Sequence, residues 1–389
     1  MEESVSFDIR NIILNKQEPI VIKNVLKWKI LQWTLSDWKS ALHNEKLEFR
    51  RGFNTSSNEP QWERKTKLLK GDFEYFLNHA QNNTKEWLYF DYKQLNTWFK
   101  DNQSIRQELE WDPLGFPDIK PEDCTIWIGS KGAHTSCHMD CYGFNLVYQI
   151  YGSKIWLLFP PEENLKPSRI PYEESSIYSK LNFFSPNVND FIGLSNKCRK
   201  VILNPGDMLF VPHKWWHYVE NLETSISINV WLPKAEDDKE RVKESIVQYF
   251  VKQITETADR EENNRMLNPN MDEVILGHNK SSFMETIHKC RKIYQDKLSN
   301  KKSCTECQAT KNKTEPTTTT INVQDVVYTV PVLTKDEFLE FLYQQANRFH
   351  DVESSNTYKS DDNDDTNKFL EAITHPEVVD LIANILINN

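Results

Sequence analysis

Short strand-like runs separated by turn residues fill the middle of the chain, between Thr125 and Leu232. The last of them, SISINVWL, alternates polar and apolar residues, which places successive side chains on opposite faces of a β-strand. Many short strands separated by turn residues are typical of an antiparallel sandwich or barrel. The runs are TIWIG, NLVYQI, KIWLLF, KVILNPGD, MLFVP and SISINVWL.

The residues before this region predict one strand and at least two helices. EPIVIKNV is a β-branched run behind a proline, so we expect a strand that begins at Ile20. Thr34, with Asp37 three residues later, predicts a helix start, and Gly71-Asp72 opens a second helix. The run WLYFDYKQL fits either a helix or a strand.

After Pro233 the apolar positions return to the helical period. One stripe of this segment is apolar, and it could pack within the chain or join two copies as a homodimer. Farther on, VYTVPVL is strand-like, TKDEFLEFLYQQANRF begins with a capping box, and HPEVVDLIANILI predicts a short helix. The stripe consists of Val242, Ile246, Tyr249, Phe250 and Ile254.

These patterns divide the chain into five regions and predict a mainly β fold with flanking helices. A stretch with few apolar residues separates the last two regions, so we expect it to be a flexible linker. The regions are a helical and strand support region at 1–110, a β core at 111–233, a helical segment that could dimerise at 234–297, the linker at 298–322, and a small acidic helical region at 323–389.

Composition narrows the class of protein. The formal net charge of -10 and the pI near 5.6 give no positive field for nucleic acid or an acidic membrane. The sequence has no 18-residue apolar run and no basic and apolar leader at its start, so we expect a soluble intracellular protein of the cytoplasm or nucleus. Seven irregularly spaced cysteines predict reduced thiols.

Candidate chemistry concentrates between Ala133 and Pro161. His138 and Asp140 lie one residue apart, and His217 follows at the end of a later strand. An HxD pair alone is not specific, and an isolated histidine is more often a core or surface residue. Two imidazoles and one carboxylate on one face of a metal are the ligand set of non-haem Fe(II) oxygenases, which leaves other positions open.

Lys154 follows in the apolar run YGSKIWLLFPP. Burial of its ammonium group would be costly unless an anion pairs with it, and a dicarboxylate co-substrate would be such an anion. Two strands also carry polar residues on one face, which would face solvent in a sandwich or line a cavity in a barrel. These faces are Ser225, Ser227 and Asn229 on one strand, and Asn145, Val147 and Gln149 on the other.

The cysteines leave one alternative metal site open. Cys304 and Cys307 form a CxxC motif near His288 and Cys290. The spacing matches no standard zinc pattern and the segment has few apolar residues, so ordinary thiols are favoured. Cys137 and Cys141 flank the HxD pair and are favoured as buried small residues rather than ligands.

The residues around these candidates resemble a JmjC domain, and the asparaginyl-hydroxylase branch in particular. The likeness runs from about Pro19 to Trp231, with one extra residue between Asp140 and Asn145 and with Ser136 where proline is common. Two stretches, 132–154 and 168–180, are similar to a group within that branch that is associated with small heat-shock proteins. The likeness rests on Thr135 to Asp140, Asn145, Gly152 to Lys154, Phe159 to Pro161, Gly206-Asp207, Pro212, Trp215 to His217 and Asn229 to Trp231.

The resemblance implies a double-stranded β-helix core of the cupin type, with a C-terminal helical extension. It also implies Fe(II), 2-oxoglutarate and O2 as the cofactor and co-substrates. The matching residues are His138, Asp140 and His217 for the metal, Lys154, Thr135 and Tyr89 for the distal carboxylate of 2-oxoglutarate, and Asn145 and Asn229 near both.

The implied activity is hydroxylation of a protein side chain by a 2-oxoglutarate-dependent dioxygenase, with a link to small heat-shock proteins and the stress response. Histone demethylation and tRNA modification are disfavoured, because the sequence shows no Cys/His-rich reader module or basic face. Specificity is expected from variable loops such as Leu165 to Ser185. The alternatives are a regulatory protein that binds small heat-shock proteins through a retained JmjC scaffold, and a cupin isomerase or zinc enzyme.

Overall fold

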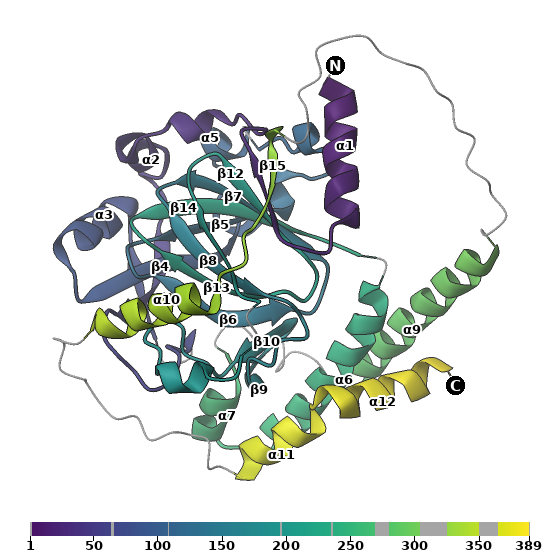
Figure 1. Cartoon of the computed structure of the whole chain (residues 1–389). Helices are drawn as coiled ribbons and strands as arrows, with labels where there is room; N and C mark the ends of the chain where they lie inside the picture. Colours follow the sequence, from purple (N-terminus) through teal and green to yellow (C-terminus); the bar gives the residue numbers. More distant parts are fainter. Residues whose placement is uncertain are drawn as a thin grey trace.

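The computed structural model describes residues 2–63, 66–107, 109–194, 197–234, 236–268, 280–303, 325–349 and 365–388. Their strands form two antiparallel sheets that share one interior, with helices outside them (Figure 1). This arrangement is the mainly β jelly-roll core with a helical C-terminal region that the sequence predicts. No helix among the described residues is long and apolar enough to cross a bilayer.

The larger sheet contains nine of the described strands. It includes strands from the start, the middle and the end of the chain, so the predicted support region is continuous with the core. Across the sheet the order is β15 (Val327–Thr329), β1 (Ile20–Lys23), β12 (Asp207–Val211), β7 (Phe144–Tyr151), β14 (Ser225–Leu232), β5 (Thr125–Gly129), β4 (Glu86–Gln94), β2 (Leu47–Phe53) and β3 (Lys67–Gly71).

The smaller sheet contains six of the described strands. Four of them, β6, β9, β10 and β13, are not among the predicted runs, and His217, expected at the end of a strand, is the second residue of β13. Every predicted run of the middle region forms a strand, and the run from Trp87 to Leu95 forms most of β4. Across this sheet the order is β11 (Arg199–Leu203), β8 (Lys154–Phe159), β13 (Trp216–Asn221), β6 (His134–Asp140), β10 (Ser176–Ser179) and β9 (Pro167–Glu173).

N-terminal helices cover the outer face of the larger sheet, where their apolar residues form one core with the β5 and β14 side chains that point outward. The predicted helix starts are confirmed, because Thr34 accepts from the backbone N–H of Asp37 and Asp72 accepts from that of Tyr75. The helices are α1 (Glu2–Asn15), η1 (Lys29–Gln32), α2 (Leu35–Ala41), α3 (Phe73–Asn82), α4 (Leu95–Trp98), α5 (Gln103–Arg106), η3 (Asp112–Leu114) and η4 (Pro121–Asp123).

The C-terminal helices pack in two places (Figure 1). Helix α10 (Lys335–Asn347), which starts at the predicted Thr334 capping box, lies on the outer face of the smaller sheet near η5 (Val188–Phe191). The others surround α6 (Asp237–Thr255) beyond the sheets. They are α7 (Arg260–Met266), α9 (Lys280–Ser303), α11 (Asp365–Ile373) and α12 (Pro376–Asn388).

The apolar stripe after Pro233 packs within the chain, since Val242 and Ile246 are buried against α9 and α12. Dimerisation through this stripe stays a prediction. The linker expected at 298–322 begins later than predicted, because α9 continues to Ser303. The rest of that segment, with Cys304 and Cys307, lies outside the described residues.

The attachment of α10 can be tested by shortening Leu342, which is fully buried in the core between α10 and the smaller sheet. We expect Leu342→Ala to lower the free energy of unfolding in urea by about 2–5 kcal/mol, because it leaves a cavity. The neighbouring Tyr343 is 55% exposed, so Tyr343→Ala should change the free energy of unfolding by less than about 0.5 kcal/mol. Equal effects of the two substitutions would show that α10 does not pack as described.

Candidate active site

Two neighbouring strands of the smaller sheet bring three metal-ligating side chains together. His138 and Asp140 alternate along β6 and so share its inner face, and β13 places His217 directly opposite His138. One ligand atom from each residue lies within 4.8 Å of the other two, and His138 Nε2 is 3.7 Å from Asp140 Oδ1. Among the described residues this is the one cluster of His, Cys, Asp or Glu with such geometry.

Both imidazoles are oriented by backbone carbonyls. His138 Nδ1–H donates to the carbonyl of Ser136 at 2.9 Å, and His217 Nδ1–H donates to that of Trp215 at 3.0 Å. These bonds fix the tautomer and leave each Nε2 available to a metal. Burial, with a smaller contribution from His217, lowers the pKa of His138 to about 4 despite the opposing effect of Asp140. His138 is therefore neutral near pH 7, as a metal ligand must be.

Trp231 orients the carboxylate of Asp140. The indole N–H donates to Asp140 Oδ2 at 3.0 Å, so the other oxygen, Oδ1, is the one that faces His138. In the sequence, Trp231 belongs to the family likeness but carries no signal of a role in the site. The donor set of two imidazoles and one oriented carboxylate fits a divalent metal ion such as Fe(II).

Lys154 supplies a buried cation to the same pocket. Its ammonium group donates to Ser227 Oγ at 2.8 Å and to Tyr89 Oη at 3.4 Å. No carboxylate of the described residues lies within ion-pair distance of it, although Lys154 is only 1% exposed. Burial lowers the pKa of Lys154 to about 7, and the more distant Asp91 offsets part of this effect. The site thus fits a ligand that brings its own carboxylate.

The remaining predicted residues surround these two groups. Thr135 hydrogen-bonds to Tyr89, whose pKa is raised chiefly by burial. Asn229 Nδ2 donates to Asn145 Oδ1 at 2.9 Å, and Asn229 Oδ1 accepts from Trp127 Nε1 at 2.7 Å. The structure therefore brings all eight predicted site residues together, with Asp140 at the metal cluster and the other seven lining one pocket.

The polar faces of β7 and β14 line this interior. Ser227, Asn229 and Asn145 are each buried at the pocket, while the alternate residues of β14 join the core beneath the N-terminal helices. The polar faces of these two strands therefore line a cavity, and the alternative that they face solvent is wrong. Both faces of β14 are covered, because helices occupy the side that a bare sandwich would leave to water.

Aromatic residues that were not predicted as site residues complete the walls of the pocket. Trp156 stacks near His217 with ring centroids 5.9 Å apart, and Tyr92 lies 4.6 Å from Trp127. Nothing in their spacing distinguishes them from core residues, since tryptophan and tyrosine are common in buried strands. Cys137 and Cys141 are buried and outside the ligand cluster, as expected.

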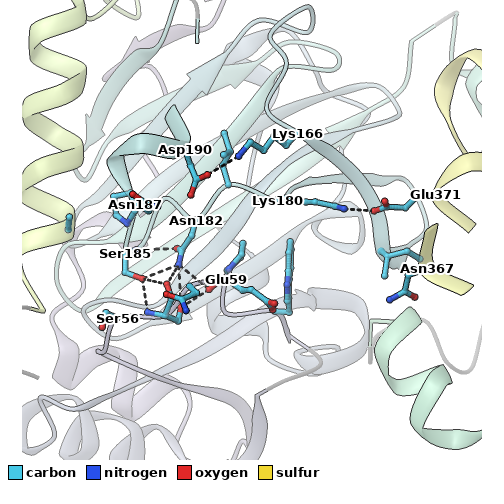
Figure 2. Close-up of a pocket in the computed structure, with 18 of the residues that line it drawn as sticks. Ser56, Glu59, Lys166, Lys180, Asn182, Ser185, Asn187, Asp190, Asn367 and Glu371 are labelled. Atoms are coloured by element: carbon cyan, nitrogen blue, oxygen red, sulfur yellow. Dashed lines mark hydrogen bonds and ion pairs between the residues drawn. The ribbon is translucent and has the colours of Figure 1, made fainter. Parts of the chain in front are cut away.

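A larger polar hollow of about 620 Å³ is lined by a separate set of residues (Figure 2). The ion pairs Lys166–Asp190 and Lys180–Glu371 lie on its walls. The Trp62 ring, which lines the hollow, contacts the Tyr178 ring at 5.5 Å, and Tyr178 in turn lies 5.8 Å from His138. Two aromatic side chains therefore stand between the hollow and the metal cluster.

Comparison with known proteins agrees with this site. The model of the family described as "Cupin-like domain" matches residues 6–238. The chain is 39% identical over 278 residues to "HSPB1-associated protein 1" of Bos taurus, and the aligned region covers 67% of this chain and 57% of that protein. It is 34% identical over 285 residues to the "HSPB1-associated protein 1 homolog" of Danio rerio, which covers 69% and 63%.

A more distant similarity is to a protein whose name states an activity. The chain is 28% identical over 158 residues to "Lysine-specific demethylase JMJ31" of Arabidopsis thaliana, which covers 39% of this chain and 28% of that protein. The chain spans less than two thirds of the length of each of these three relatives.

Proposed function

The chain belongs to the cupin-like JmjC family, and on that premise we propose that it is an Fe(II)- and 2-oxoglutarate-dependent oxygenase that hydroxylates a protein side chain. One observation carries the proposal: a buried lysine with no carboxylate partner among the described residues shares a pocket with a His–Asp–His cluster. A metal and a dicarboxylate would satisfy both features together. The distant relative named as a demethylase supports a catalytic role for this fold.

The three ligands would hold the metal from one side and leave its remaining positions open. When bound, Fe(II) and 2-oxoglutarate together supply the O2-dependent oxidation of a C–H bond. The backbone carbonyls of Ser136 and Trp215 keep the imidazoles in place, and Trp231 does the same for Asp140. The chain's own part is thus to fix an open coordination geometry before substrate arrives.

Lys154 would pair with the distal carboxylate of 2-oxoglutarate, assisted by the hydroxyl groups of Tyr89 and Thr135. In a water-poor pocket this charge pair is stronger than it would be in solvent. The linked amides of Asn145 and Asn229 would lie beside the metal and co-substrate, and Trp127 fixes their orientation. No acid–base pair is required of the protein.

We also propose a small heat-shock protein as a partner or substrate, because two relatives are named as HSPB1-associated. Substrate-specific contacts are assigned to the stretch from Leu165 to Ser185, six of whose residues line the polar hollow of Figure 2. The names of these relatives also support a second candidate function, a regulatory protein that binds a small heat-shock protein without catalysis. The complete ligand set favours catalysis over that second candidate.

The experiment that separates the two candidates uses purified protein with Fe(II), 2-oxoglutarate and cell extract. Catalysis should add the mass of one oxygen atom to specific peptides, and the same peptides should be unchanged with the His138→Ala variant. Capture of a small heat-shock protein equally by both forms, without any modified peptide, would favour the binding protein.

The pKa of Lys154 leads to a pH dependence of co-substrate binding. Above pH 7 the free lysine is largely neutral, and a bound carboxylate would raise its pKa, so binding should take up a proton. Affinity for 2-oxoglutarate should be constant below pH 7 and fall above it, approaching about tenfold per pH unit. Calorimetry in two buffers of different ionisation enthalpy measures this uptake. Uptake that persists in Lys154→Met would assign the proton to another group.

A further inference from the structure

One face of helix α6 holds the turn that follows Asp140. The turn consists of residues 141–143, which join β6 to β7, and each of its residues meets one residue of the helix. The contacts are Gly143 N–H to Asp237 Oδ1 at 2.8 Å, the Tyr142 ring with the Arg241 guanidinium 4.5 Å from its centroid, and Cys141 Sγ to Glu244 Oε1 at 3.4 Å.

The three helix residues are spaced so that they share one face. Asp237, Arg241 and Glu244 are four and three residues apart, which places them above one another along a helix. The chain therefore runs in opposite directions in the helix and in the turn, and each residue of the turn contacts one residue of the helix. Gly143 allows this close path, because its φ is +57° and a Cβ there would come within 2.2 Å of the Leu232 carbonyl oxygen.

Glu244 connects this turn to the neighbouring β9–β10 hairpin. Its second oxygen, Oε2, accepts from Arg169 Nη2 at 2.5 Å and from the backbone N–H of Ser175 at 3.2 Å. Arg169 in turn donates from Nη1 to the carbonyl of Ser176 at 3.0 Å, and Ser176 lies opposite Asp140 in the sheet. The carboxylate and the guanidinium are both buried, so their charges depend on each other.

These contacts reach Asp140 from both sides. Cys141, the next residue in the chain, donates its backbone N–H to the carbonyl of Ser175 at 2.7 Å and its thiol to Glu244. Ser176 fixes the strand on the other side of Asp140. A shift of the Glu244 carboxylate would therefore move the end of β6, where the Asp140 side chain begins.

We infer that Glu244 is a positioning residue for Asp140, which sets the place of this carboxylate at the metal through Arg169 and the 141–143 turn. The inference rests on the proposed function, because it needs Asp140 to bind a metal. Glu244 lies beyond residue 238, where the match to the cupin-like family model ends. The metal site thus depends on a part of α6 that lies beyond the matched region.

The test measures the affinity of the full chain for Co(II) alone by calorimetry, the visible spectrum of the bound Co(II), and the melting temperature. Glu244→Gln keeps the size of the side chain and removes its charge. Because a lone buried Arg169 can prevent folding, a second variant combines Arg169→Met with Glu244→Leu, which replaces the whole ion pair by apolar groups. Ile246→Ala is the control, because Ile246 packs on the opposite side of α6 against α9 and α12.

Both Glu244 variants are expected to bind Co(II) about 10- to 100-fold more weakly than wild type, with an altered spectrum, as for other residues that orient a metal ligand. Ile246→Ala should lower the melting temperature and leave Co(II) affinity unchanged. Wild-type affinity in the folded Glu244 variants, or an equal loss in Ile246→Ala, would overturn the inference and leave the proposed function intact. Absence of Co(II) binding by the wild type would overturn both.

Discussion

Replacing Asp140 by alanine is expected to abolish specific binding of Fe(II), and with it all turnover of 2-oxoglutarate. Asp140 contributes the single carboxylate of the cluster, and without it only the two imidazoles of His138 and His217 remain. Residues that only orient a ligand typically contribute 10- to 100-fold to metal affinity, so loss of a ligand should exceed roughly 100-fold. Anaerobic titration calorimetry with Fe(II) measures this loss of affinity. His138→Ala, which removes another ligand, should show the same loss.

A matched control for this loss is Asp190→Ala. Asp190 is an exposed aspartate that pairs with Lys166 on the wall of the polar hollow, away from the cluster. It should leave Fe(II) affinity unchanged. If Asp140→Ala bound Fe(II) as tightly as Asp190→Ala, the metal would lie elsewhere and the assigned ligand set would be wrong.

Replacing Lys154 by methionine is expected to separate the two ligands of the site. Affinity for 2-oxoglutarate should fall by roughly 30- to 4,000-fold, because losing one partner of a buried charge pair costs about 2–5 kcal/mol. Fe(II) should still bind, since Lys154 contacts Ser227 and Tyr89 rather than a ligand. The ligand-free variant should also unfold at a higher urea concentration, because it no longer buries an unpaired ammonium group.

The control for Lys154 is Lys197→Met, which removes an exposed lysine paired with Glu162 outside the pocket. Lys197→Met should change neither the affinity for 2-oxoglutarate nor the affinity for Fe(II). Calorimetry of 2-oxoglutarate binding to the metal-loaded variants gives the comparison. Equal 2-oxoglutarate affinity in Lys154→Met and Lys197→Met would refute the role assigned to Lys154.

The ligands and the lysine could be predicted from sequence because each carries a local signal. His138 and Asp140 alternate within one strand, and Lys154 stands out as a charge in an apolar run. The extra residue before Asn145, a departure from the family pattern, is absorbed by the 141–143 turn, and Asn145 still reaches the pocket. A turn can take up such an insertion without shifting the alternation of the next strand.

Strands β6, β9 and β10 escaped prediction for physical reasons. Strand β6 places ligands on one face and Cys137 and Met139 on the other, so it shows no run of β-branched residues. Strand β9 contains two prolines, Pro167 and Pro171, and the buried charges Arg169 and Glu173, which are typical of loops unless they have partners. Helix α1 was missed because its buried Ile9 and Ile13 mark a single turn.

Each of these buried charges has a partner far away in the sequence, although Glu173 also accepts from the nearby Tyr178 hydroxyl. Arg169 pairs with Glu244, 75 residues later, and Glu173 accepts from Asn268, 95 residues later. No periodicity within one element links such residues, so their pairing appears only in the folded chain. The contacts that hold the end of β6 were for this reason beyond sequence analysis, whereas the ligands themselves were not.

The most direct measurement of the central claim is a calorimetric titration of 2-oxoglutarate into anaerobic wild-type protein, with and without Fe(II). The proposed function predicts one binding site per chain that tightens when Fe(II) is present and weakens in Lys154→Met. Absence of 2-oxoglutarate binding in the presence of Fe(II) would contradict it.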